Sequence, residues 1–196
     1  MSLAVIGAGG HARVVIGLCR ALGLDVRGLY DDFETNSVMG VPILGTTSSA
    51  SGPAVLAIGD NRVRQRLSTL PCQWLTLVHP AAWVDPTVRL GAGSVVFAGA
   101  VIQPEAVLGS HCIVNTSASV DHECRLADFA QVAPGAHLGG RVIVGEGAFL
   151  GIGASVIQGI EIGAWATVGA GAAVVKHVEP GVQVVGVPAK PRVRVP

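Results

Sequence analysis

The C-terminal part of the chain repeats every six residues, and this period limits the fold more than any other feature. Sixteen positions spaced six apart, from Val84 to Val174, are all Val, Leu or Ile. Four places after each stands a small residue, mostly Ala, Val or Ser, with Cys112, Cys124 and Ile160 as the exceptions. A helix repeats at 3.6 residues and an amphipathic strand at two, so a strict six predicts a short strand plus a tight turn. Three such units form one triangular coil of a parallel β-helix.

The composition agrees with this interior. Half of the 196 residues are hydrophobic, yet 4% are aromatic and 13% charged, as expected for a narrow core of aliphatic and small side chains. Such a chain is neither disordered nor a coiled coil. Glycine also recurs at the second place of many units, where we expect it to suit tight corners: Gly91, Gly109, Gly139, Gly145, Gly151, Gly163 and Gly169.

Charge and cysteine content exclude several classes of partner. Thirteen basic and thirteen acidic residues cancel, so no global field attracts nucleic acid or an anionic membrane. The uncharged residues 35–59 contain Pro42 and Pro53 and do not resemble a membrane span. The start MSLAVIGAGG lacks the pattern of a secretory signal, so we expect a cytoplasmic protein. The four cysteines show no CxxC spacing, and we expect no disulfide and no metal site.

The first eighty residues follow a different pattern. A buried strand (LAVI), a glycine-rich turn and a helix precede a second strand (DVRGLYDD), and a third strand (PAVLAIGDN) leads into the helix NRVRQRLSTL. This order predicts a Rossmann-like βαβαβ unit, about half of a dinucleotide-binding fold. His79 and Pro80 mark the junction, so we predict domains at residues 1–79 and 80–196.

The glycine-rich turn has the spacing of a nucleotide-binding loop. Gly7, Gly9 and Ala12 fit G-x-G-x-x-A, and the acidic pair Asp31 and Asp32 follows about twenty residues later. A tight strand-to-helix turn with a purely structural role is the alternative.

His122 and Glu123 occupy the third and fourth places of one unit, so they should project outward from a corner. Residues eighteen apart should stack in adjacent coils, which places the pair among Pro104, Glu105, Gly140 and Arg141, with Gly140 leaving room beside the imidazole. A neutral imidazole can accept a proton during acyl transfer, and a neighbouring carboxylate can orient it. The alternative is a solvated corner without a role.

Several motifs together resemble one enzyme family. DHEC within NTSASVDHECRLADFAQVAPGAHLGG, the leading GAGGHA, DDF, AIGDN and the terminal GVPAK are similar to bacterial hexapeptide-repeat N-acetyltransferases that act on UDP-linked 4-amino-4,6-dideoxy sugars. Perosamine N-acetyltransferases and sialic acid O-acetyltransferases share this plan. The resemblance covers essentially the whole chain. It implies a left-handed β-helix, acetyl-CoA as co-substrate, no metal, and a homotrimer with active sites between subunits.

The resemblance also implies roles for individual residues. His122 would be the general base and Glu123 its partner. The substrate would be held by Gly9, Gly10, His11, Asp31, Asp32, Asp60, Asn61 and Asn115, of which Asn115 would place the acceptor sugar. Acetyl-CoA would contact Gly140, Gly151, Ile152, Gly169 and Ala170, and its phosphates would meet Lys176, Lys190, Arg192 and Arg194. Gln131 stands where some relatives have a second His touching the cofactor, so that contact is open.

Other basic residues are assigned weaker roles. His11 contacts substrate or caps its helix. His111, His137 and His177 are predicted to lie on the surface, and Arg62, Arg64 and Arg66 to be mainly solvated. Three other functions stay open: O-acetylation of a sialic acid, a metal hydratase resembling γ-carbonic anhydrases, and a nucleotide-binding scaffold without catalysis.

Overall fold

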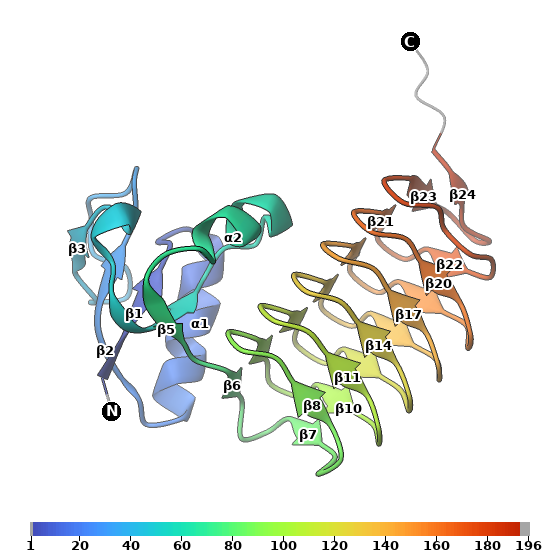
Figure 1. The fold of residues 1–196 in the computed structure, drawn as a ribbon, viewed down its shortest axis with the longest axis horizontal. Coiled ribbons are helices and arrows are strands. Elements are labelled where there is room, and N and C mark those ends of the chain that lie inside the picture. The colour runs from blue at the N-terminus through green and yellow to red at the C-terminus, as the bar shows by residue number, and fades with distance from the viewer. Residues whose placement is uncertain (1, 193–196) are drawn as a thin grey trace.

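The computed structural model describes residues 2–192 and divides into an N-terminal α/β domain and a long β-helix (Figure 1). The N-terminal elements, in chain order, are β1 (Ser2–Ile6), α1 (Gly10–Ala21), β2 (Asp25–Tyr30), β3 (Ile43–Gly45), the 3-10 helix η1 (Thr47–Ser49), β4 (Gly52–Leu56), α2 (Asn61–Leu67) and β5 (Cys72–Trp74). All five strands are parallel, in the order β3-β2-β1-β4-β5. This confirms the Rossmann-like unit and adds β3 and β5, which the sequence pattern does not predict.

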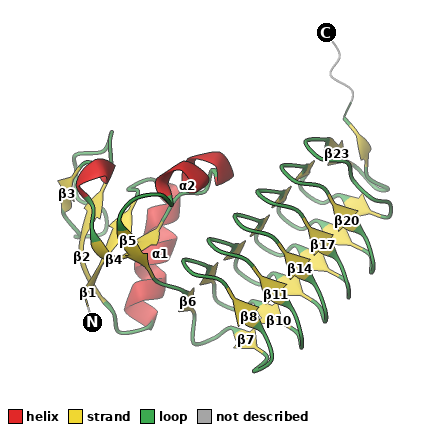
Figure 2. Cartoon of the chain, viewed as in Figure 1, coloured by secondary structure: helices red, strands yellow, loops and turns green. Residues whose placement is uncertain are grey.

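The β-helix has three sheets of very short strands (Figure 2). Sheet 1 contains β6 (Leu77–Val78), β9 (Val95–Val96), β12 (Ile113–Val114), β15 (Gln131–Val132), β18 (Phe149–Leu150), β21 (Thr167–Val168), β23 (Gln183–Val185) and β24 (Lys190–Pro191). Sheet 2 contains β7 (Trp83–Val84), β10 (Val101–Ile102), β13 (Ser119–Val120), β16 (His137–Leu138), β19 (Ser155–Val156) and β22 (Ala173–Val174). Sheet 3 contains β8 (Arg89–Leu90), β11 (Val107–Leu108), β14 (Arg125–Leu126), β17 (Ile143–Val144) and β20 (Glu161–Ile162). The β-helix thus begins at Leu77, slightly before the predicted junction.

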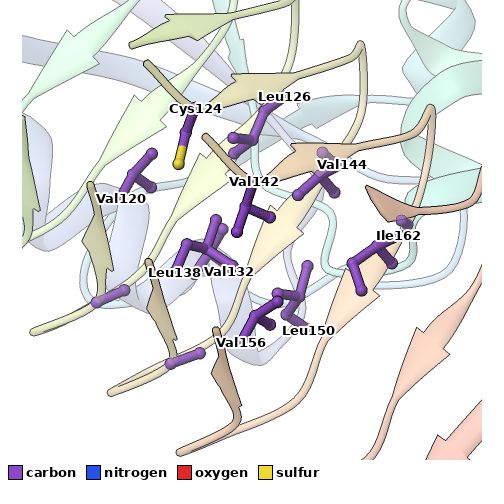
Figure 3. Close-up of a cluster of buried hydrophobic side chains, with 14 of the residues drawn as sticks. Val120, Cys124, Leu126, Val132, Leu138, Val142, Val144, Leu150, Val156 and Ile162 are labelled. Carbon is purple, nitrogen blue, oxygen red and sulfur yellow. The ribbon is translucent and has the colours of Figure 1, made fainter. Parts of the chain in front are cut away.

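The core of the β-helix consists of the two periodic positions found in the sequence. Val120, Cys124, Leu126 and Val132 all point inward, with neighbours from the adjacent coils (Figure 3). Cys112 and Cys124 are fully buried, which confirms their assignment as small core residues. Full burial of such an aliphatic side chain contributes about 1.5–3 kcal/mol, so the repeated column accounts for much of the stability.

Neighbouring coils align with an offset of eighteen residues. Ser119 pairs with Val101 on one side and with His137 on the other. Because the strands are parallel and evenly spaced, residues eighteen apart lie about 4.8 Å from each other. Each edge of the prism therefore carries vertical columns of residues, and the position of a side chain in its column decides what lies above and below it.

The glycines at the second place of many units were predicted to suit tight corners, but the structure gives them a different role. The fourth place of each unit has a left-handed backbone from Gly93 to Gly171, and this column includes Glu123 (φ 59°). Glycines at the second place do not have this backbone. They are needed because coils pack closely: a Cβ on Gly145 would lie 2.4 Å from the backbone nitrogen of Ala164.

The N-terminal domain docks on the outer face of sheet 1 and on the edge between sheets 3 and 1. Val95, Phe97 and Ile113 of the β-helix share one apolar cluster with α1 and β1. Helix α2 lies along the edge and hydrogen-bonds to it through Asn61 and Arg64. The docking leaves the edge between sheets 2 and 3 for other contacts.

Candidate active site

His122 lies in the turn between β13 and β14, on the edge between sheets 2 and 3. The Asp121 carboxylate accepts a hydrogen bond from the His122 backbone N–H at 2.8 Å. The Glu123 N–H donates to the Pro104 carbonyl in the coil below at 3.0 Å. Val120 and Cys124 point into the core, so the left-handed turn between them directs His122 and Glu123 outward, as predicted.

The two side chains form a bonded pair. His122 Nδ1 is 2.9 Å from Glu123 Oε2, and the two side chains are 48% and 47% exposed. Arg141 Nη1, from the coil above, lies 3.9 Å from the same carboxylate oxygen. Engagement of Nδ1 by Glu123 leaves Nε2 as the ring nitrogen that can accept a proton from a ligand.

Gly140 makes room for this imidazole. A Cβ at residue 140 would lie 2.5 Å from both Cε1 and Nε2 of His122. The ring therefore covers the glycine directly, and the backbone of the next coil forms one wall of the site. This confirms the stack of His122 beneath Gly140 that the repeat predicts.

A charged groove of about 640 Å³ runs beside Glu123 over the outer face of sheet 3. Its lining includes the basic residues Arg89, Arg125 and Arg141 and the acidic residues Glu105 and Glu123. The mixed charge gives this face hydrogen-bond donors and acceptors for a polar ligand that reaches the His122–Glu123 dyad.

Five other β-helix residues predicted for the site lie on another edge. Asn115 occupies the turn between sheets 1 and 2, and its Oδ1 accepts from the Thr116 N–H at 2.8 Å. The same edge carries four of the residues predicted for the cofactor, of which Ile152 is 61% exposed: Gly151, Ile152, Gly169 and Ala170. Within one chain, His122 and Gly140 are therefore not on the same edge as Asn115 and these four.

The C-terminal end brings two predicted lysines together. Lys176 and Lys190 both line a hollow of about 460 Å³ whose other walls are largely apolar, from Val174 to Pro191. Arg192 follows directly after β24 and is exposed. Arg194, also predicted to meet phosphates, lies outside the described residues.

The glycine-rich turn after β1 is open and joined to the acidic loop. The Ala8 N–H donates to Asp31 Oδ2 at 2.7 Å. A Cβ at Gly9 or Gly10 would meet nothing within 4 Å, and neither residue has a left-handed backbone. Packing does not require glycine at these two positions, whereas close approach of a ligand would.

Asp31 and Asp32 both accept hydrogen bonds from nearby backbone N–H groups. Burial acts to raise the pKa of Asp31, but the N–H groups of Glu34, Phe33 and Ala8 outweigh it and hold the pKa below its ordinary value. Asp32 accepts hydrogen bonds from the N–H and hydroxyl of Thr47. The pair therefore fixes the loop after β2, and contact with a nucleotide stays a prediction.

His11 and the Asp60–Asn61 pair lie where the domains meet. The His11 ring packs edge-on against Phe97 with centroids 5.5 Å apart, and its Nε2 is buried without a partner within residues 2–192. Burial and the nearby charge of Arg64 lower the pKa of His11 to about 4, so the ring is neutral at pH 7. Asp60 caps α2, accepting from two backbone N–H groups, while Asn61 Nδ2 donates to the Gly147 carbonyl at 3.0 Å. Asp60 and Asn61 border a hollow of about 300 Å³ facing the β-helix.

Two expectations about surface residues are wrong. Arg64 is 1% exposed because α2 presses it against the β-helix, where its guanidinium donates to backbone carbonyls. His111 points away from the prism as predicted, but the N-terminal domain covers it. It stacks on Phe129 and meets Trp74 edge-on. Gln131 is also buried here, with its Oε1 3.5 Å from Arg64 Nη1.

Over residues 2–192, no group of three or more His, Cys, Asp or Glu side chains is placed to hold a metal ion. No helix in that range has the length and apolar character needed to cross a membrane.

Comparison with known proteins gives two partial matches in sequence. The PglD N-terminal domain family matches residues 2–69. A protein of Acanthamoeba polyphaga mimivirus, L142, described as uncharacterized, is 32% identical over 99 residues, which make up 47% of this chain and 20% of that protein. The chain therefore spans about a fifth of the length of that relative.

Solved structures match over nearly the whole length. The acetyltransferase domain of PglB from Neisseria gonorrhoeae, in complex with acetyl coenzyme A, is 42% identical, with a TM-score of 0.93 over 97% of this chain and 98% of that one. A point mutant of GDP-perosamine N-acetyltransferase from Caulobacter crescentus, in complex with CoA and GDP-perosamine, is 41% identical, with a TM-score of 0.92 over 98% and 97%. WeeI from Acinetobacter baumannii is 25% identical, with a TM-score of 0.86 over 98% and 100%. These matches confirm the expected fold, a Rossmann-like domain followed by a left-handed β-helix, and show that the chain is an acetyltransferase belonging to the hexapeptide-repeat nucleotide-sugar N-acetyltransferase family.

Proposed function

We propose that the protein transfers the acetyl group of acetyl-CoA to the amino group of a nucleotide-linked amino sugar, with His122 as the general base. The observation that carries this proposal is the His122–Glu123 pair, 2.9 Å apart, half-exposed and seated on Gly140. The perosamine enzyme, which binds CoA and GDP-perosamine, and the PglB domain, which binds acetyl coenzyme A, support the two substrates.

The chemistry needs one proton acceptor and one donor. The amine nitrogen attacks the thioester carbonyl, the N–C bond forms, and His122 Nε2 takes the proton that the nitrogen loses. Glu123 stabilises the imidazolium through Nδ1–H. The C–S bond then breaks, and His122 returns the proton to the departing sulfur. Backbone N–H groups near the thioester would stabilise the oxyanion.

The substrates would meet between chains of a homotrimer. Support for this part comes from the two separate edges that carry the expected residues: His122 and Gly140 on one, Ile152 and Ala170 on the other. A neighbouring chain can bring the second edge to the first. The open turn at Gly9 and Gly10 would hold the nucleotide diphosphate. The cytoplasmic location expected from the sequence stays a prediction.

A thiol-release assay tests the reaction. UDP-, GDP- and dTDP-linked amino sugars are compared with free sialic acid, which carries no nucleotide and would reveal O-acetylation instead. His122→Ala should lose most turnover while acetyl-CoA binding survives. His137→Ala is the matched control, since this exposed histidine stands on sheet 2 one coil away. Near-normal kcat in His122→Ala would remove His122 from the mechanism.

Co-expression tests the shared site. The His122→Ala variant disables the edge between sheets 2 and 3, and the Ile152→Arg variant disables the edge between sheets 1 and 2. If one site draws on both edges of different chains, mixed oligomers regain part of the activity that each pure variant lacks. If both edges act within one chain, mixing restores nothing.

A further inference from the structure

Arg64 is a buried charge without a charged partner. Among residues 2–192 the ion pairs within 4.0 Å are His122–Glu123 and Glu123–Arg141, and neither involves Arg64. Its guanidinium is instead satisfied by neutral oxygens. Burying an arginine in this way costs free energy that an apolar side chain of the same volume would not cost, so stability alone does not explain its presence.

The acceptors of Arg64 belong to consecutive coils. Nε donates to the His111 carbonyl at 3.0 Å, and Nη2 to the Phe129 carbonyl at 2.7 Å. These residues are eighteen apart, in one column. Asn61, one helical turn earlier on α2, donates to Gly147, the next residue in that column. Helix α2 thus binds three successive carbonyls along the edge between sheets 3 and 1.

Such contacts fix where α2 lies along the edge. The carbonyls along this edge repeat every 4.8 Å or so, whereas the packing of Trp74 on His111 is made at one coil only. A planar guanidinium with donors in a fixed fork selects particular carbonyls. The arginine therefore excludes positions of α2 between the coils, while the contact of Trp74 with His111 selects the coil.

The same guanidinium reaches the proposed substrate loop. Nη1 donates to the Ile58 carbonyl at 3.0 Å, in the loop between β4 and α2 that continues into Gly59 and Asp60. One side chain thus ties this loop to two coils of the β-helix.

We propose that Arg64 is a positioning residue for acetyl transfer: it holds the nucleotide-sugar-binding domain in the one register against the β-helix that presents the acceptor amine to the catalytic imidazole. This inference rests on the proposed function. Displacement of reacting groups by about 1 Å can cost on the order of a hundredfold in rate, so loss of the register should appear in kcat.

The experiment compares Arg64→Met and Arg64→Lys with Arg66→Met and Arg66→Lys. Arg66 is the matched control because it is exposed on the same helix. Four quantities are measured: kcat with the best nucleotide sugar of the panel, acetyl-CoA affinity, affinity for the free nucleoside diphosphate, and amide hydrogen exchange of residues 58–67. Activity of the wild-type protein is measured first, so that failure of the proposed function is distinguished from failure of the role proposed for Arg64. Hydrogen exchange reports on the docking of α2 even if the wild type shows no activity with the panel.

The expected result is a loss of kcat of about 10- to 100-fold in Arg64→Met, with both affinities within about twofold and faster exchange in residues 58–67. Arg64→Lys keeps the charge but not the fork and should lie in between; if Arg64→Met does not fold, this variant decides. The proposal is overturned if kcat matches the Arg66 variants, or if the loss follows weakened nucleoside diphosphate binding, which would place Arg64 in the ligand site.

Discussion

Replacing Gly140 with alanine should displace the proposed base while leaving its chemistry intact. The added methyl carbon would lie 2.5 Å from Cε1 and Nε2 of His122. Carbon atoms make favourable contact at about 3.5–4.0 Å, so the ring has to move by about 1 Å or more. The backbone at residue 140 is not left-handed, so alanine adds no backbone strain there.

A shift of this size predicts a fall in kcat of about a hundredfold, with His122→Ala setting the lower limit. Stability should change little, because the half-exposed ring can swing toward solvent. Gly17→Ala is the control, since it adds a methyl group that meets nothing within 4 Å.

Steady-state thiol release and acetyl-CoA calorimetry separate the possible causes. A loss confined to kcat supports displacement of the base. A loss confined to KM for acetyl-CoA would show instead that the methyl group obstructs the thioester. If Gly140→Ala keeps kcat within twofold of wild type, the imidazole does not act from this position and the reasoning fails.

Three further predictions follow from the contacts described above. Glu123→Gln keeps an acceptor for Nδ1–H but removes the charge that stabilises imidazolium, so kcat should fall at least about tenfold; unchanged kcat would make the carboxylate a bystander. Burial, followed by the charge of Arg64, lowers the pKa of both His11 and His111 to about 4. The unfolded chain binds these protons near pH 6.5, whereas the folded chain binds them only near pH 4. The free energy of unfolding should therefore drop by up to about 3 kcal/mol per ring as pH falls from 6.5 to 4. Urea titrations that give the same free energy of unfolding across this window would contradict the prediction. Asp60→Ala removes the cap of α2 and should cost about 1 kcal/mol in urea unfolding, with Asp60→Ser restoring most of it.

The repeat predicted the β-helix well because each unit carries its own signal. An aliphatic and a small residue recur without insertion, and this fixes which side chains point inward and which coils stack. The sequence does not predict β3 and β5, because neither strand carries a signal of this kind. Each has three residues, ILG and CQW, too few for an alternating pattern to be recognised.

Arg64 and His111 show where a sequence pattern stops being informative. The period predicts correctly that His111 points away from the prism, but it says nothing about what covers that face. Burial there depends on contact between residues 61–65 and residues 111–147, far apart in the chain. For Arg64, the spacing of three arginines on a short helix did not reveal which one faces the second domain.

The position of the dyad was predictable because a repeat carries its functional information in the outward columns. The inward columns are nearly uniform, so no coil differs from another there. The outward column through His122 reads Pro86, Pro104, His122, Gly140 and Gln158. In this column the imidazole of His122 is followed directly by Gly140, which has no side chain. The structure shows that the imidazole occupies the space that a side chain at residue 140 would fill. A glycine one coil after an outward histidine is therefore a stronger indication of a site than the histidine alone.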